Sequence, residues 1–217
     1  MESIRGRGNS TWGLSKKPYR IRLSREADLF GLGPAKSWNL LANGYDETRL
    51  RNQIVLDLAS HLDMSYVPGG RMIDLYLNGV YQGNYFLTEK IRVDENGVAI
   101  RDMEKALEEA YSAQELEKLK LCQNEDGSRK WADTQLPEGA QEDISGGYLF
   151  ERELMSRFKT EISGFITDQG DCYTLQSPLY ASREQVDYIA DLMQEFQDAC
   201  EEADGVHPVT GKHYSEY

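Results

Sequence analysis

The sequence predicts an α+β protein, in which flanking helices pack against a mostly antiparallel sheet. Residues 16–23 alternate polar and apolar side chains, as a strand with one buried face does. Residues 72–91 have the pattern of a β-hairpin with Asn-Gly at its turn. Segments 46–62 and 182–203 repeat apolar side chains at helical spacing. We expect the strands to share one sheet, with both helices packed against it.

The composition is that of a folded globular protein. Of the 217 residues, 40% are hydrophobic and 28% are charged. This length suffices for one sizeable domain or two small ones, and we expect a single domain over residues 1–217. No run of about 18 apolar residues occurs, so we expect no membrane span. The three cysteines are widely spaced and form no C-x-x-C pair, which argues against a disulfide framework or a zinc ribbon.

The charge is unevenly distributed along the chain. The formal net charge is -13, yet residues 1–25 hold seven Lys or Arg and one acid, whereas residues 102–217 hold ten bases and 26 acids. The negative field of the whole protein disfavours nucleic acid as a partner. The basic N-terminal segment predicts a site for a small anion, unless its bases pair with acids of the second half.

A glycine-rich stretch, RGRGNSTW at residues 5–12, directly precedes the basic strand. Its two glycines would let backbone amides approach a phosphate oxygen closely, and its two arginines would add charge-assisted hydrogen bonds. The alternative is an ordinary turn whose arginines pair with acids of the same chain. We favour phosphate binding, because a basic strand follows the turn at once.

The next elements are a helix and a hairpin. Asp46 is the expected N-cap of helix 46–62, and the apolar stripe of that helix should face the core. The stripe consists of Leu50, Ile54, Leu58 and Leu62, widened by Val55 and Ala59. In the hairpin, direct pairing would place the polar Asn84 opposite Ile73. One extra residue would turn Tyr85 to the apolar face, so we expect a bulge at or beside Gly83. These elements complete the region 1–101.

The second half is predicted less uniformly. We expect a helix over residues 102–121 and a polar loop over 122–145, which together form an insertion outside the core. Strands should follow at 147–154 and 161–176, and Ser182 with Gln185 forms a capping box for the last helix. The turn between the strands contains Asp168 and Asp171. Because aspartate is common in turns for local reasons, we predict no metal site there.

Six blocks resemble the CotH family of spore-coat and secreted bacterial proteins. In chain order they are RGRGNSTW, KKPYRIRL, WNLLANGYDETRLRNQIVLDLA, DLYLNGVYQGNYFLTEKI, GGYLFE and YTLQSPLYASREQVDYI. The resemblance runs from about residue 4 to the C-terminus, apart from residues 102–145. It implies an atypical protein-kinase-like fold, the use of ATP with a divalent metal such as Mg, and phosphate transfer to Ser or Thr of a coat or secreted protein. It also implies a spore coat, secreted or cell-envelope location.

The kinase resemblance suggests a nucleotide site within residues 5–91. A kinase small lobe places a Gly-rich turn and a lysine near the phosphates, and a hinge segment near the adenine. We favour Lys17 over Lys16 as that lysine. Glu89 would either orient Lys17 by an ion pair or hold the adenine at the hinge. The predicted nucleotide-binding residues are Arg5, Gly6, Arg7, Gly8, Asn9, Lys17, Glu89 and Lys90.

One departure from the family concerns catalysis. The family's acidic segment, which resembles WDFD and holds metal and acceptor, has no counterpart in this sequence. We therefore expect the chain to be the N-terminal part of a kinase domain, truncated before the catalytic residues and inactive by itself. The alternative function is non-enzymatic, namely a coat or envelope interaction module whose arginines bind a carboxylate or a partner protein.

Overall fold

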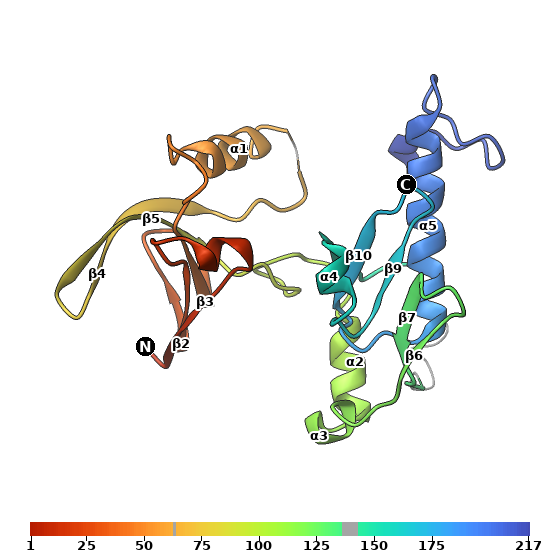
Figure 1. Cartoon of the computed structure of the whole chain (residues 1–217), viewed down its shortest axis with the longest axis horizontal. Helices are drawn as coiled ribbons and strands as arrows, with labels where there is room; N and C mark the ends of the chain where they lie inside the picture. The colour runs from red at the N-terminus through yellow and green to blue at the C-terminus, as the bar shows by residue number, and fades with distance from the viewer. Residues whose placement is uncertain (63, 136–142) are drawn as a thin grey trace. The chain divides into compact units, whose positions relative to one another are not determined.

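The computed structural model describes residues 1–62, 64–135 and 143–217. It contains two compact units, Met1–Ala99 and Ile100–Tyr217 (Figure 1). The α+β prediction is confirmed, but the strands form two antiparallel five-stranded sheets, one in each unit. The prediction of a single shared sheet is therefore wrong. The reason is that residues predicted to be a loop after residue 121 form two strands, which pair with each other and with a later strand to build the second sheet.

The first unit contains a sheet with the strand order β1-β2-β3-β5-β4. The strands are β1 (Ser3–Gly6), β2 (Tyr19–Asp28), β3 (Pro34–Leu41), β4 (Gly70–Leu77) and β5 (Val80–Glu89). A 3-10 turn, η1 (Ser10–Gly13), lies between β1 and β2. One face of the sheet carries a buried cluster that includes Trp38, Leu40, Tyr85 and Leu87. This face is the core of the unit, as the alternation of β2 predicts.

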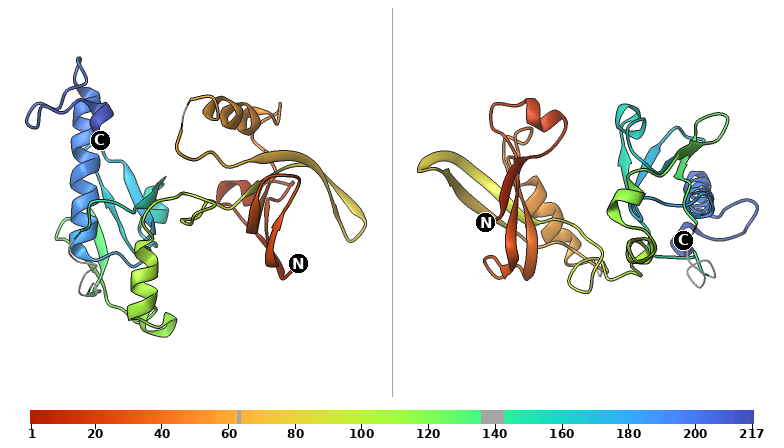
Figure 2. Two further views of the ribbon diagram at one scale, coloured as in Figure 1. Left: turned by 180° about the vertical axis from the view of Figure 1, so that it is seen from behind. Right: turned by 90° about the horizontal axis from the view of Figure 1, so that it is seen from below.

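The hairpin of β4 and β5 confirms the predicted bulge. Asn78 and Gly79 both have positive φ, 50° and 80°, as a type I′ turn requires. Tyr76 pairs with Tyr81, but Leu75 pairs with Gly83, so Gln82 is the extra residue. Ile73 consequently lies opposite Tyr85, which is 1% exposed. The hairpin tip extends away from the rest of this sheet (Figure 2).

The helix of the first unit corrects the prediction in two respects. α1 spans Arg51–Ala59 and is thus shorter than 46–62. Its apolar stripe is exposed, with Ile54 at 59% and Leu58 at 57% exposure. The core face is filled instead by strand side chains and by loop residues such as Leu29 and Leu32. Helical periodicity shows that one side of a helix is apolar, but it does not specify which surface covers that side.

The second unit contains a sheet with the order β6-β7-β9-β10-β8. Its strands are β6 (Leu121–Gln123), β7 (Arg129–Ala132), β8 (Leu149–Glu153), β9 (Gly164–Ile166) and β10 (Cys172–Ser177). The predicted loop 122–145 is wrong where β6 and β7 form a hairpin, because β7 is an interior strand paired with β9. Residues 136–142 of that loop lie outside the described residues.

Short helices precede this sheet. The predicted helix 102–121 is divided into α2 (Met103–Ala110) and α3 (Ala113–Leu116). The division occurs because Ser112 forms a capping box with Glu115 and starts a new helix. A further short helix, α4 (Met155–Phe158), follows β8.

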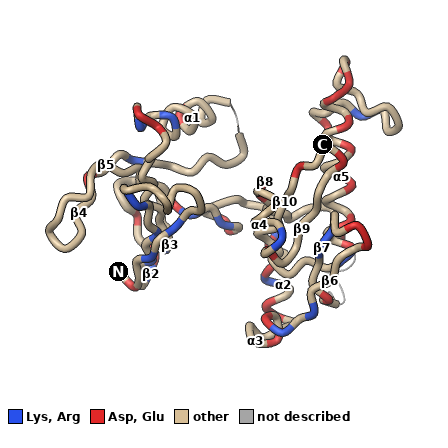
Figure 3. Tube along the Cα trace, viewed as in Figure 1, with Lys and Arg blue, Asp and Glu red and all other residues tan. Residues whose placement is uncertain are grey.

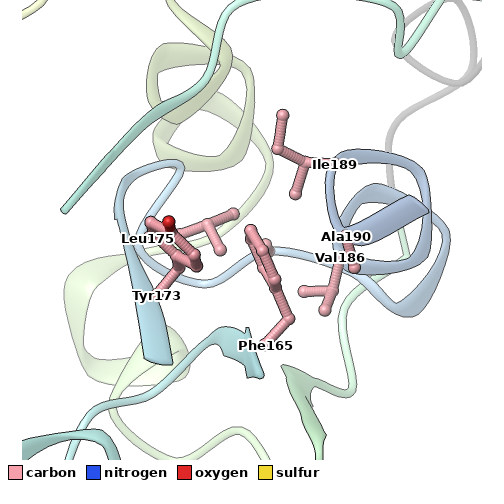
Figure 4. Close-up of a cluster of buried hydrophobic side chains, with 7 residues drawn as sticks. Phe165, Tyr173, Leu175, Val186, Ile189 and Ala190 are labelled. Carbon is pink, nitrogen blue, oxygen red and sulfur yellow. The ribbon is translucent and has the colours of Figure 1, made fainter. Parts of the chain in front are cut away.

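The last long helix, α5 (Arg183–Glu201), covers one face of the second sheet. The predicted capping box of Ser182 and Gln185 is confirmed. Val186 and Ile189 of α5 pack on Phe165 and Leu175 from the strands (Figure 4). A 3-10 turn, η2 (Tyr214–Glu216), follows near the C-terminus. Among the helices of the described residues, none has the length and apolar character needed to cross a bilayer.

Candidate functional site

The glycine-rich turn is shaped by contacts within itself. Gly8 has a φ of 84°, in the left-handed region that favours glycine. A Cβ at Gly6 would lie 2.4 Å from the ring of Trp12, so the missing side chain makes room for that ring. The Trp12 ring packs in a T-shaped arrangement against the ring of Tyr19, which lies on the core face. The ring centroids are 6.3 Å apart. The turn is therefore anchored on the core side by its tryptophan.

A pocket of about 270 Å³ lies beside this turn. Its size is close to the lower end of ligand pockets, which run from about 300 to 1,000 Å³. Arg7 and Thr11 come from the turn, whereas the other polar residues come from the loop between β3 and α1 and from the first turn of α1. The lining consists of Arg7, Thr11, Pro18, Leu41, Ala42, Asn43, Gly44, Tyr45, Asp46, Arg51 and Asn52. The Gly-rich turn and the segment of residues 41–52 thus meet here.

Asp46 organises the helical side of the pocket. Its carboxylate accepts hydrogen bonds from the backbone N–H of Arg51, at 2.9 Å, and from the hydroxyl of Thr48, at 2.7 Å. The hydroxyl of Thr48, followed by the N–H of Arg51, lowers the pKa of Asp46. Leu50 is the N-cap of α1, so the prediction of Asp46 at that position is wrong. Asp46 nevertheless satisfies a first-turn donor from outside the helix.

Two asparagines hold the loop after β3 against α1. Asn52 Nδ2 donates to Asn43 Oδ1 at 2.8 Å, and Asn43 Nδ2 donates to the carbonyl of Arg49 at 3.0 Å. Asn43 and Arg49 both have positive φ, 49° and 60°. These bonds fix the backbone that carries Asp46 and Arg51 into the pocket. The sequence-based prediction did not include this loop, although a run of polar residues directly before a helix is a recognisable signal.

The two adjacent lysines point to different surroundings. Lys17 Nζ donates to the carbonyl of Trp12 at 2.6 Å and lies 5.4 Å from the centroid of the Trp12 ring. Lys16 is half-buried, and its Nζ donates to the carbonyls of Ala42, at 3.0 Å, and of Asn84. Desolvation and the charge of Arg49 lower the pKa of Lys16. Of the two, Lys16 is the one that contacts a residue of the pocket lining.

Glu89 does not make the predicted pair with Lys17. It lies opposite Trp38, on the core face, and is only 6% exposed. Its carboxylate accepts a hydrogen bond from the guanidinium of Arg92. Because Lys17 is bound to Trp12, the turn and Glu89 are not joined through that lysine.

Arg5 and Lys90 belong to the opposite face of the first sheet. Cross-strand partners share a face, and Arg5 pairs with Arg20, which pairs with the polar Asn39 of β3. Arg22 follows two residues later on the same face. We call the side chains of Arg5, Arg20, Arg22 and Lys90 the basic face. Figure 3 shows the basic positions along β2.

These residues fit the phosphates of a nucleotide better than they fit a metal. Arg7 and Arg51 line the pocket, and guanidinium groups bind phosphate oxygens through paired hydrogen bonds. Within the described ranges, no group of three or more His, Cys, Asp and Glu side chains is arranged to hold a metal ion. We therefore assign no metal ligand.

Comparisons with known proteins identify the family. No curated protein matches the sequence. A family model described as CotH kinase protein matches residues 4–203, which is most of the chain. The match includes the turn, the pocket and the basic face, and it confirms the resemblance seen in the six sequence blocks. The chain belongs to the CotH kinase protein family.

Proposed function

We propose that this chain provides the nucleotide-binding part of an ATP-dependent kinase that transfers phosphate to Ser or Thr of a coat or secreted protein. The observation that carries the proposal is the pocket, where the Gly-rich turn supplies Arg7 and the start of α1 supplies Arg51. In this proposal the phosphates lie between those two guanidinium groups. Of the predicted nucleotide-binding residues, Arg7 lines this pocket, and Gly8 and Asn9 follow it in the turn without lining the pocket.

The order of elements supports this assignment. A Gly-rich turn, two strands, a helix, a hairpin and a connecting segment follow one another in residues 1–99. Protein kinases place their Gly-rich loop, the β3 strand and the αC helix in the same order. We propose that this unit is the small lobe of a kinase-like domain. It departs from protein kinases in the Lys–Glu pair, since Lys16 and Lys17 both donate to backbone carbonyls.

The residues of this chain would contribute binding and orientation. ATP supplies the phosphoryl group, and a divalent metal such as Mg would neutralise its charge. Arg7 and Arg51 would stabilise phosphate oxygens electrostatically. The two asparagine bonds described above would hold the backbone at the start of α1 in place before the ligand arrives, which lowers the entropic cost of ordering that segment on binding.

Titration calorimetry of ATP with magnesium tests the proposal on the 217-residue chain. Arg7→Ala and Arg51→Ala should each lower ATP affinity by about 10- to 100-fold, the effect of removing a hydrogen bond to a charged group. Arg25→Ala is the matched control, because Arg25 is an exposed β2 residue outside the pocket lining. Equal affinity of all four proteins for ATP would refute the pocket assignment.

The second candidate function is a non-enzymatic interaction module. The exposed apolar stripe of α1 favours it, because large exposed apolar patches mark interaction sites. The same titration separates the two functions, since the interaction module needs no ATP.

A further inference from the structure

The basic face is distinct from the pocket. None of its four cations is among the residues that line the pocket. Arg5, Arg22 and Lys90 are exposed, so a ligand can reach them from solvent. Arg22 Nε of this face pairs with the carboxylate of Glu2 at 3.2 Å, and the Arg22 side chain still keeps 54% exposure. This is a second cationic surface in the first unit.

The strand register sets the spacing of these cations. Arg5 and Arg20 are direct cross-strand partners, so their Cβ atoms are about 4.5–5.5 Å apart. Arg20 and Arg22 lie two residues apart on one strand, a separation of about 7 Å. Lys90 is held next to them, because its backbone N–H donates to the carbonyl of Ser37, at 2.9 Å, and Ser37 is the partner of Arg22. A single tetrahedral anion can therefore contact several of them together.

Arg20 is oriented from beneath by a buried side chain. Its Nε donates to Asn39 Oδ1 at 3.1 Å. Asn39 is 7% exposed and donates in turn to the backbone carbonyl of Glu89, at 3.4 Å. A guanidinium that is held in place before binding loses less side-chain entropy when it contacts an anion.

The charges of this face act on one another. Desolvation lowers the pKa of Lys90, and the positive charges of Arg20, Arg5 and Arg22 lower it further. These four positive charges lie close together on adjacent strands and repel one another. They therefore favour a compact ligand that carries more than one negative charge. A phosphate monoester carries about -1.5 to -2 charges at neutral pH and has three acceptor oxygens.

We propose that the basic face binds a phosphorylated serine or threonine on an extended segment of protein. The complementary charge of the phosphate selects the ligand, and Arg5, Arg22 and Lys90 are exposed to a protein segment that approaches from solvent. A nucleic acid is disfavoured, because the protein's net charge of -13 repels a polyanion. The inference rests on the proposed function in one respect: a Ser/Thr kinase makes this group, so the face would hold a substrate that is already partly phosphorylated.

Fluorescence anisotropy of a labelled peptide tests the inference. A serine peptide and its phosphoserine form are titrated with the 217-residue chain at one fixed salt concentration. The phosphopeptide should bind at least about 10-fold more tightly than the serine peptide, as expected for charge-assisted hydrogen bonds. Arg5→Ala with Arg22→Ala should abolish this difference, whereas Arg25→Ala should preserve it. Equal affinity of the two peptides for the unaltered chain would overturn the proposal.

Competition identifies the source of the phosphate. Unlabelled phosphopeptide should displace the label at a lower concentration than inorganic phosphate does. Displacement by both at the same concentration would mean a site for free phosphate, and would overturn the assignment to a protein segment. The inference would be equally wrong if Arg5→Ala with Arg22→Ala lowered ATP affinity as strongly as Arg7→Ala does, because the basic face would then belong to the nucleotide site.

The two proposals fail separately. If Arg7→Ala weakens ATP binding while the phosphopeptide shows no preference, only the inference about the basic face is wrong. If the phosphopeptide preference depends on Arg5 and Arg22 while ATP does not bind, the kinase proposal is wrong and the phosphate-binding face remains.

Discussion

Lys16 Nζ donates a hydrogen bond to the backbone carbonyl of Ala42 at 3.0 Å. This bond joins the segment between the Gly-rich turn and β2 to the residue that follows β3, across 26 positions of sequence. The same amine lies 4.4 Å from the centroid of the Tyr85 ring and also donates to the carbonyl of Asn84. The segment before β2 is therefore fixed to the sheet by Lys16, the lysine that the strand pattern did not favour.

Replacing Lys16 should destabilise the first unit more than replacing its neighbour. Lys16→Met leaves the carbonyls of Ala42 and Asn84 without this donor, and we expect the free energy of unfolding to fall by about 1–3 kcal/mol. Lys17→Met should change it by less than about 0.5 kcal/mol, as for most surface substitutions. Urea unfolding of both variants measures the difference. An equal loss of stability in the two would show that the hydrogen bonds of Lys16 do not stabilise the first unit.

Gly70 should not tolerate a side chain. A Cβ at this position would lie 1.9 Å from Cζ of Phe86, a ring that is fully buried. Gly70→Ala should lower the free energy of unfolding by about 1–3 kcal/mol, because a buried ring has little room to move. Gly79→Ala is a poor control, since φ is positive there. Gly13→Ala suits better, because nothing lies within 4 Å of its Cβ position. Thermal unfolding that is unchanged in Gly70→Ala would show that the ring shifts freely.

The start of α1 should depend on pH through Asp46. Its pKa in the folded chain is below the ordinary value of 3.8, so the carboxylate stabilises the helix start above that value. This contribution is lost as the pH falls through the folded pKa. In Asp46→Ala, the Arg51 amide should exchange with solvent faster than in the unaltered chain near neutral pH. The two rates should converge at a pH below the folded pKa, and rates that differ equally at every pH would argue against Asp46.

The exposed stripe of α1 should contribute little to stability. Leu58 is 57% exposed, so Leu58→Gln should change the free energy of unfolding by less than about 0.5 kcal/mol. Leu87 is 1% exposed, and Leu87→Ala should cost about 2–5 kcal/mol. Chemical denaturation compares the two variants. A large loss in Leu58→Gln would mean that the stripe is covered in solution.

Local patterns were the features that the sequence predicted best. The Asn78-Gly79 turn, the bulge beside Gly83 and the cap at Ser182 each depend on a few neighbouring residues, and all three are confirmed. The second sheet was missed because β6 and β7 have only three and four residues, and the sequence around them is mostly polar. Strands this short show too few alternations to be recognised. Their place is set by pairing with β9, which a local pattern does not contain.

The candidate site was predicted in part, for a similar reason. Arg7 was recognised from its place between two glycines, and it does line a pocket. The choice between Lys16 and Lys17 could not be made from strand proximity. Lys16 donates to the carbonyls of Ala42 and Asn84, whereas Lys17 donates to the carbonyl of Trp12 and lies over its ring. The pairing of Arg5 with Arg20 depends on the register of β1 against β2, which tertiary packing sets.

The bulge in β5 gives the hairpin a tolerance to changes of length. Gln82 has no partner residue across the ladder, so the strand carries one spare residue between the turn and the core. If a single residue among 80–84 were lost, direct pairing from the Asn78-Gly79 turn would still bring Tyr85 opposite Ile73. A second loss would turn Tyr85 and Leu87 to the other side of the sheet. The hairpin should therefore lose one residue of this strand without disturbing the core of the first unit.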